Sequence, residues 1–322
     1  MSTSRSVNYN NTRNEIIRDS LELIGAYGVG QTISSEDQRF CENQLNRMVK
    51  AWQGKGIHLW AKGHAYLYPG DTANVGEFSL GYASEVHTTL QEEASNTQLT
   101  AAAVATDTVL TVEDTQIMAG ADILGLVLAD GTVHWTTIVS VGSTTSVTIT
   151  DAVPSAANSG ANVYSYTSPV NKPLRIQSMN CIRGMDLGAT TTRTESPMTL
   201  LTQDEYFNLS IKTISGTPTH FYYQPQLDTG RLFLWPRPDS VSTYFEFTFD
   251  KILEDFDSAL NTPDFPSEWL ECIVYQLAYR IAPAFGKNKN MVQPEASSML
   301  ADMLDWDQEI GTVQIVPDHR GY

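Results

Sequence analysis

Cysteine and positive charge are both scarce in this sequence. Only three of its 322 residues are cysteines, Cys41, Cys181 and Cys272, and they are odd in number and far apart. This excludes a disulfide framework and a paired-cysteine metal site, so we expect buried free thiols in a protein made in a reducing compartment. Lysine and arginine number 20 against 37 acidic residues, which gives a formal net charge of −17. Because proteins that grip DNA need clustered basic residues, this balance argues against a general nucleic-acid binder.

Long hydrophobic runs are also lacking. The longest, such as residues 123–129, fall far short of the ~20 residues that cross a bilayer. Residues 1–10 are polar and carry no apolar stretch of the kind found in signal peptides. We therefore expect a soluble protein that is not secreted by the usual route and does not associate with membranes.

The usual enzyme motifs are absent as well. The sequence contains no GxxxxGKS/T phosphate loop, no HExxH zinc motif and no GxSxG nucleophile elbow. Its glycine-rich stretch, residues 25–30, follows a predicted helix rather than a strand, which indicates a helix terminator. The two densest carboxylate groups, Glu92-Glu93 and residues 254–257, are typical of solvated faces. The sequence therefore predicts a protein that is not an enzyme, with no catalytic residues, no metal ligands and no cofactor.

What the chain does have is enough apolar residues, 41%, for a sizeable core, and a length that suggests two units or one elaborated unit. Its charge is unevenly divided. Residues 91–168 hold eight acidic residues and no basic one, and no lysine or arginine occurs between Lys62 and Lys172. Residues 251–322 carry a further net charge of −7. A base-free stretch of this length indicates a domain of different composition inserted into a host.

The base-free stretch also has the pattern of a β domain. Valine, threonine, alanine and serine dominate it, and turn residues recur about every ten positions. Asp130-Gly131 between two apolar segments is a strong hairpin signal, and residues 142–146 indicate a second hairpin. We therefore predict an inserted all-β domain over residues 95–168.

The flanking regions carry helix signals. Thr12 and Glu15 fit a capping box ahead of apolar residues at helical spacing, and a second helix is predicted to begin near Ser34. Two such helices joined by a short loop predict an N-terminal helical hairpin. Pro266 and Pro294 mark the starts of two further amphipathic helices near the other end of the sequence.

Short strands are predicted between these helices, at residues 221–223, 231–235 and 244–249. The expected fold class is therefore α+β: a helical bundle, made of the N-terminal hairpin and two C-terminal helices, with a small antiparallel β element and an inserted all-β domain. The expected domains are the N-terminal helical hairpin with the start of the host (1–94), the β insert (95–168), the rest of the host (169–310) and a C-terminal tail (311–322).

Aromatic, glycine and proline residues form several short motifs along the chain. The motifs are WQGKGIHLW over residues 52–60, Gly216-Thr-Pro218 with Tyr222-Tyr223, GRLFLWPRP over 230–238 and DFPSEW over 264–269. Together they resemble the head-to-tail adaptors of tailed phages, particularly short-tailed ones, a family that includes tail accessory and packaged-DNA-stabilising factors. The resemblance covers roughly residues 10–90 and 170–310 and leaves the β insert outside the common core. The motif residues that we expect to shape the fold are Trp60, Pro218, Trp235, Pro236, Pro238, Pro266 and Trp269.

The resemblance implies a structural virion protein at the head–tail junction, made in the cytoplasm of a host bacterium. Such adaptors form a ring, usually of twelve copies, beneath the portal protein of a DNA-filled head. The ring extends and seals the DNA channel, offers a platform to tail, nozzle and fibre proteins, and lets DNA pass without specific binding during genome ejection. An extended C-terminal segment often lies on the portal, and by position residues 311–322 would be that segment here. Its portal-contact residues would be Val313, Ile315, Val316 and Tyr322.

Two other functions are compatible with the residues. The β insert could bind a receptor or glycan through a platform of Trp135, Tyr164 and Tyr166, with or without cell-wall hydrolysis, or it could decorate the ring and contact neighbouring tail proteins. The N-terminal helices could instead bind DNA weakly, because they concentrate the positive charge, although six acidic residues lie among the basic ones. Those basic residues are Arg13, Arg18, Arg39, Arg47, Lys50 and Lys55.

Overall fold

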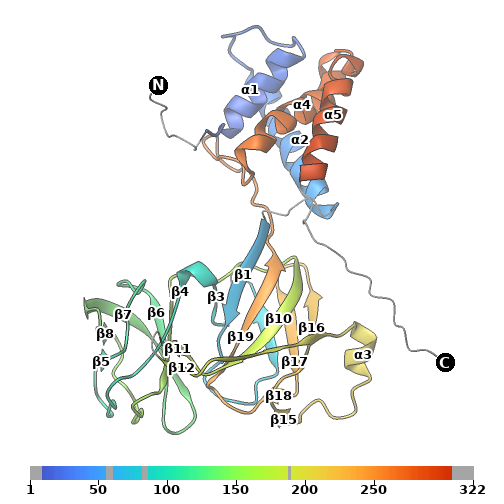
Figure 1. The fold of residues 1–322 in the computed structure, drawn as a ribbon. Helices are drawn as coiled ribbons and strands as arrows, with labels where there is room; N and C mark the ends of the chain where they lie inside the picture. Colours follow the sequence, from blue (N-terminus) through green and yellow to red (C-terminus); the bar gives the residue numbers. More distant parts are fainter. Residues whose placement is uncertain (1–8, 56–60, 82–85, 188–189, 307–322) are drawn as a thin grey trace, which may run out of the picture. The chain divides into compact units, whose positions relative to one another are not determined.

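The computed structural model describes residues 9–55, 61–81, 86–187 and 190–306. The chain divides into two units, one formed by Met1–Ala61 with Leu253–Tyr322 and the other by Lys62–Ile252. Figure 1 shows helices in the first unit and almost only strands in the second. The two ends of the chain therefore build one unit, and its middle builds the other.

The first unit is helical, and the sequence marks where its helices begin. They are α1 (Arg13–Leu23), α2 (Ser35–Gly54), α4 (Leu270–Ile281) and α5 (Gln293–Trp306), with the 3-10 turns η3 (Ser267–Trp269), η4 (Ala282–Phe285) and η5 (Lys289–Met291). The predicted capping box is confirmed, because Thr12 Oγ1 accepts from the Glu15 amide and the Glu15 carboxylate accepts from the Thr12 amide at 2.7 Å. Ser34 caps α2 by accepting from the Asp37 amide. These bonds satisfy amides that a helix leaves unpaired at its start.

The core of the helical unit forms around α4, against which α1, α2 and α5 all pack. Trp269, just ahead of α4, is fully buried, and its ring lies edge-on to that of Trp52 with centroids 5.8 Å apart. Burying an aromatic side chain removes ~150–250 Å² from water, so this pair contributes much of the apolar burial. The other buried core residues come from α1, α2 and α4 and include Ile16, Leu21, Leu45, Met48, Ile273, Leu277 and Ile281.

The second unit contains two antiparallel-rich sheets that share a core. The five-stranded sheet has the order β13 (Thr194–Pro197), β10 (Arg175–Arg183), β19 (Thr243–Asp250), β1 (Lys62–Leu67) and β3 (Thr88–Leu90). The four-stranded sheet has the order β14 (Thr199–Leu200), β16 (His220–Pro225), β17 (Gly230–Trp235) and β2 (Glu77–Leu80). Facing residues of both sheets, such as Phe247 and Leu232, meet in one apolar cluster.

A six-stranded sheet forms the rest of this unit. Its order is β4 (Ala94–Gln98), β9 (Asn162–Tyr166), β6 (Ile123–Val127), β7 (Val133–Ser143), β8 (Ser146–Ile149) and β5 (Val109–Thr111). The two edges meet just beyond β4 and β5, where a bridge joins Leu99 to Val112 and the Thr100 amide donates to the Thr111 carbonyl at 2.9 Å. The sheet therefore closes around its own apolar core. The predicted Asp130-Gly131 turn joins β6 to β7, and Gly131 adopts a φ of +84° there.

Shorter elements complete the unit. They are η2 (Gln91–Glu93), α3 (Gln203–Phe207), the paired strands β11 (Asp186–Leu187) and β12 (Thr190–Thr191), and the parallel pair β15 (Ser215–Gly216) and β18 (Arg237–Pro238).

The predicted fold class is wrong in its proportions. The expected helical bundle with a small β element is instead a chain in which sheets of five, four and six strands dominate the described residues. The error has a physical reason, which β1 illustrates. β1 begins with the polar or small residues Lys62, Gly63 and His64, and it is specified by its long-range pairing with β19 rather than by local propensity.

Candidate interaction surfaces

The described residues lack both a cluster of metal ligands and a membrane-spanning helix. Among them, no group of three or more His, Cys, Asp or Glu side chains could hold a metal ion. No helix in the described ranges is long and apolar enough to cross a membrane. Burial raises the pKa of the Cys41 and Cys272 thiols to about 12 and that of Cys181 to about 11. A thiol that stays protonated is a poor nucleophile, so these three cysteines have the character of structural core residues.

The residues expected to contact the portal, Val313, Ile315, Val316 and Tyr322, lie outside the described residues, as does Trp60. The remaining motif residues lie in two places. Pro218, Trp235, Pro236 and Pro238 gather around β16 to β18, where the Trp235–Pro236 peptide is cis and the Trp235 indole donates to the Ile211 carbonyl at 2.9 Å. Pro266 and Trp269 precede α4.

The aromatic residues expected to form a sugar platform are covered by the rest of the β unit. Tyr164 is fully buried and Tyr166 is 3% exposed, while Trp135 is half-buried. The Tyr164 ring lies 4.7 Å from that of Tyr68 on β1, and its hydroxyl donates to the Val241 carbonyl at 3.2 Å. The platform interpretation is therefore wrong, because Tyr164 and Tyr166 are buried against the neighbouring strands and do not face solvent.

The basic residues of the helical hairpin are not equally free. Arg13 is buried, pairs with Glu42 at 2.7 Å and donates to the Phe256 carbonyl. Lys50 lies 3.0 Å from Asp255. Both residues therefore fasten the N-terminal helices to the chain that leads into α4. The exposed ones that remain on α1 and α2 are Arg18, Arg39 and Arg47.

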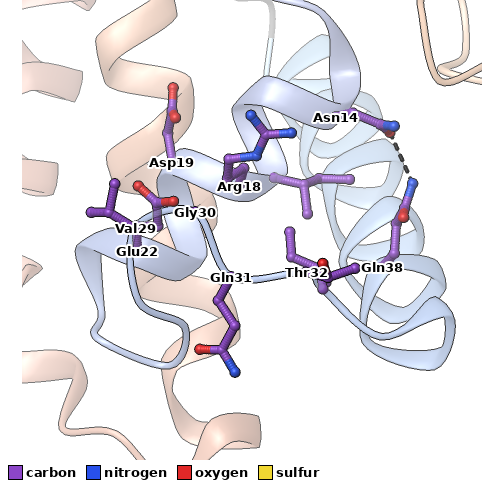
Figure 2. Close-up of a pocket in the computed structure, with 11 residues that line it drawn as sticks. Asn14, Arg18, Asp19, Glu22, Val29, Gly30, Gln31, Thr32 and Gln38 are labelled. Carbon is purple, nitrogen blue, oxygen red and sulfur yellow. Dashed lines mark hydrogen bonds between the residues drawn. The ribbon is translucent and has the colours of Figure 1, made fainter.

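A hollow of about 700 Å³ lies between α1 and the loop that leads to α2 (Figure 2). Arg18, Asp19 and Glu22 line it from α1, and Gln38 closes it by donating to the Asn14 side chain at 2.9 Å. With one cation beside two carboxylates and few apolar walls, this hollow has the character of a hydrated surface notch rather than of a small-molecule site.

Several exposed apolar side chains occur along the chain from β14, an edge strand of the four-stranded sheet. We call the segment of residues 199–216 the apolar segment. Its exposed members are Leu200 (50%), Phe207 (56%), Ile211 (58%) and Ile214 (44%). Groups of exposed apolar residues of this kind mark surfaces that bind other proteins.

The apolar segment is held in place from beneath. Thr202 and Glu205 form a second capping box at the start of α3. Tyr206 is 8% exposed and stacks on Tyr222, with ring centroids 5.5 Å apart. Lys212 Nζ donates to the Phe207 carbonyl at 3.0 Å. No pattern in the sequence predicts this surface, because its apolar residues show neither the alternation of a strand nor the spacing of a long helix.

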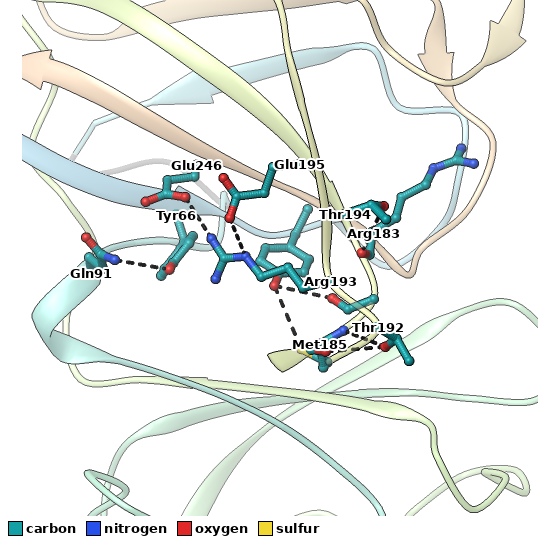
Figure 3. A network of polar contacts seen from close by, with 11 residues as sticks. Tyr66, Gln91, Arg183, Met185, Thr192, Arg193, Thr194, Glu195 and Glu246 are labelled. Carbon is teal, nitrogen blue, oxygen red and sulfur yellow. Dashed lines mark hydrogen bonds and ion pairs between the residues drawn. The ribbon is translucent and has the colours of Figure 1, made fainter. Parts of the chain in front are cut away.

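Arg193 braces the edge of the five-stranded sheet (Figure 3). Its guanidinium lies 2.7 Å from Glu195 on β13 and 2.9 Å from Glu246 on β19. Burial acts to lower the pKa of Arg193, but a hydrogen bond with Tyr66 and the nearby Glu195 charge raise it above its ordinary value. The cluster ties three strands together and has the character of a structural brace.

Comparison with known proteins identifies a family. A family model described as SU10 adaptor protein matches residues 94–318, which is more than half of the chain. The matched range includes residues 95–168, the β insert that the resemblance left outside the common core. It does not include residues 10–90, which carried part of the resemblance. No curated protein matches the chain.

Proposed function

The chain belongs to the SU10 adaptor protein family, and on this premise we propose that it is a structural component of a phage virion that forms an oligomeric ring beneath the portal. The ring connects the head to the tail, extends the DNA channel and seals it after packaging. The observation that carries the proposal is the family match over residues 94–318. We propose twelve copies per ring, as in the adaptors that the sequence resembles.

The charge of the chain supports this role. With a net charge of −17, the protein repels the phosphates of passing DNA instead of holding them. Two of the six basic residues of the N-terminal helices, Arg13 and Lys50, are already engaged with carboxylates of the same unit. DNA would therefore pass through the ring without specific binding, during packaging and during ejection.

Contacts with other virion proteins have two proposed locations. Residues 311–322, with Val313, Ile315, Val316 and Tyr322, would bind the portal protein. The exposed side chains of the apolar segment, such as Phe207 and Ile211, would bind a tail, nozzle or fibre protein, since an exposed apolar patch favours association. The assembly would form in the host bacterial cytoplasm and remain at the head–tail junction without catalysing a reaction.

The experiment is to mix the purified chain with portal rings and record native mass spectra. We expect each portal ring to bind one defined number of copies of the chain. The triple variant Val313→Ser, Ile315→Ser, Val316→Ser should form the same assemblies alone but lose the portal. The matched variant Thr312→Ala, Gln314→Ala, Pro317→Ala should keep it. A wild-type chain that stays monomeric and does not bind the portal would contradict the proposal.

A further inference from the structure

A second groove in the helical unit is acidic and partly apolar. It has a volume of about 520 Å³ and lies between α1 and the start of α4. Three carboxylates line it, those of Asp19, Glu268 and Glu271, and no lysine or arginine does. Its other lining side chains include Tyr9, Leu23, Leu270, Val274 and Tyr275. We call it the carboxylate groove.

The groove favours a binding partner that carries positive charge. Burial, followed by the neighbouring Glu22 carboxylate, raises the pKa of Asp19, although the nearby Arg18 charge acts in the opposite direction. Burial and like charge oppose the ionised form of this carboxyl group, and a further guanidinium placed beside it would reduce that cost. Tyr9 and Leu23, which are 71% and 38% exposed, add an apolar rim that an aromatic side chain could cover.

The chain itself presents a surface with these complementary features. On α2 the residues Cys41, Leu45 and Met48 are buried, and Arg39 and Arg47 lie on the opposite, exposed side. Within the described residues, neither of these two arginines has an ion-pair partner. Beside them are Asn43 and Phe40; the Phe40 side chain is 37% exposed, and its ring lies edge-on to that of Phe285 with centroids 6.2 Å apart. We call these four residues the outer face of α2.

The two surfaces lie on different sides of the helical unit. Helices α1, α2 and α4 pack against one another, and the carboxylate groove is lined by α1, α4 and their flanking residues without any residue of α2. Apart from Phe40, which contacts Phe285, the outer face of α2 points away from the core that it shares with α1 and α4. One copy can therefore offer its outer face to a second copy while its own groove receives a third. Repeated contacts between two different surfaces generate a ring when the rotation closes.

We propose that the outer face of α2 in one copy docks into the carboxylate groove of the next copy, with Arg39 and Arg47 beside Asp19, Glu268 and Glu271. This inference rests on the proposed ring and names the surfaces that form it. Phe40 meets the apolar rim of the groove, and the opposed charges fix the direction of the contact. Charge complementarity of this kind gives specificity and orients encounter.

The test uses charge reversal on each surface of the full chain. Variant A carries Arg39→Glu and Arg47→Glu, and variant B carries Glu268→Arg and Glu271→Arg. Each alone should lose the ring in native mass spectra, with self-association weakened about tenfold or more. An equal mixture of A and B should regain the ring with the two variants alternating. The reversed outer face of A then meets the reversed groove of B, and the unchanged outer face of B meets the unchanged groove of A. Recovery also shows that both variants are folded.

The control and the contrary outcomes separate this inference from the proposed function. Arg175→Glu with Arg280→Glu changes the charge equally on exposed residues that belong to neither surface and should leave the ring intact. If the wild type forms rings and A and B each form them as well, or if the mixture does not regain them, the docking proposal is wrong while the ring stands. If the wild type forms no ring, with or without portal, the proposed function fails and this inference fails with it.

Discussion

The indole of Trp135 lies flat on the imidazole of His87, with ring centroids 3.5 Å apart and planes 9° from parallel. Trp135 belongs to β7 of the closed sheet, whereas His87 precedes β3 of the five-stranded sheet. His87 Nδ1 also lies 2.9 Å from the hydroxyl of Tyr166. One histidine thus joins two sheets of the β unit by stacking and by a hydrogen bond.

Acid should weaken this junction. Burial lowers the pKa of His87 from 6.5 to about 4, so the folded chain holds the ring neutral where the unfolded chain would protonate it. The stabilising contribution is complete above pH 6.5 and is lost as the pH falls from 6.5 toward 4. Its full size is roughly 3 kcal/mol, at about 1.4 kcal/mol per pKa unit.

The measurement is urea unfolding of the chain at several pH values between 4 and 7.5. The variant His87→Phe, which keeps a ring against Trp135, should lose most of the pH dependence in this window. His64→Phe changes an exposed histidine on β1 and should retain it. A His87→Phe profile as steep as that of the wild type would show that His87 is not the group responsible.

Tyr68 should be the side chain on which the attachment of the closed sheet depends most. It is fully buried between the rings of Tyr164 and Tyr244, and its hydroxyl donates to Asn96 at 2.8 Å. Tyr68→Ala should lower the free energy of unfolding by about 3–5 kcal/mol, as for other large buried aromatic residues.

Tyr68→Phe is the matched control for that prediction, because it keeps the ring and removes only the hydroxyl. It should lower the free energy of unfolding by about 1 kcal/mol. Equal losses for the two variants in urea unfolding would show that the hydroxyl, and not the packed ring, carries the contribution.

Arg193 and Arg231 should differ although both are in ion pairs. Arg193 and its partner Glu246 have side chains only 20% and 16% exposed, while Arg231 and Glu77 are 50% and 53% exposed. Arg193→Ala leaves Glu246 partly buried without its cation and should destabilise the chain by about 1.5–3 kcal/mol. Arg231→Ala should cost about 0–1 kcal/mol, because solvent screens an exposed pair. Equal losses in thermal unfolding would contradict this account of the Arg193 brace.

The apolar segment should affect association rather than stability. Phe207→Ser with Ile211→Ser removes two exposed apolar side chains, so the free energy of unfolding should change by about 0.5 kcal/mol or less. Binding to tail proteins should weaken, as measured by co-sedimentation of the variant with the isolated tail. The matched variant Thr213→Ala with Asn208→Ala should bind as the wild type does. Unchanged binding by Phe207→Ser with Ile211→Ser would remove this surface from the proposal.

The sequence predicted those features that local chemistry decides. Thr12 with Glu15, and Ser34 with Asp37, marked helix starts that the structure confirms, and Asp130-Gly131 marked a turn. The resemblance to phage head-to-tail adaptors is confirmed by the family match, although the match extends over the β insert.

Features decided by distant partners were not predictable from local pattern. All five residues of β9 are buried, because Val163 faces the core of the closed sheet while Tyr164 and Tyr166 face the adjoining strands. A strand covered on both sides loses the alternation that distinguishes an exposed face. For the same reason the size of the β unit was underestimated. The pairing of Arg13 with Glu42 joins two helices and could not be predicted from the pattern of either one.

The most direct test of the central claim is a cryo-EM class average of the chain bound to portal protein, viewed along the portal axis. The account predicts a closed ring of identical copies, coaxial with the portal and open at its centre. Isolated monomers beside bare portal rings, or copies bound without rotational symmetry, would contradict it.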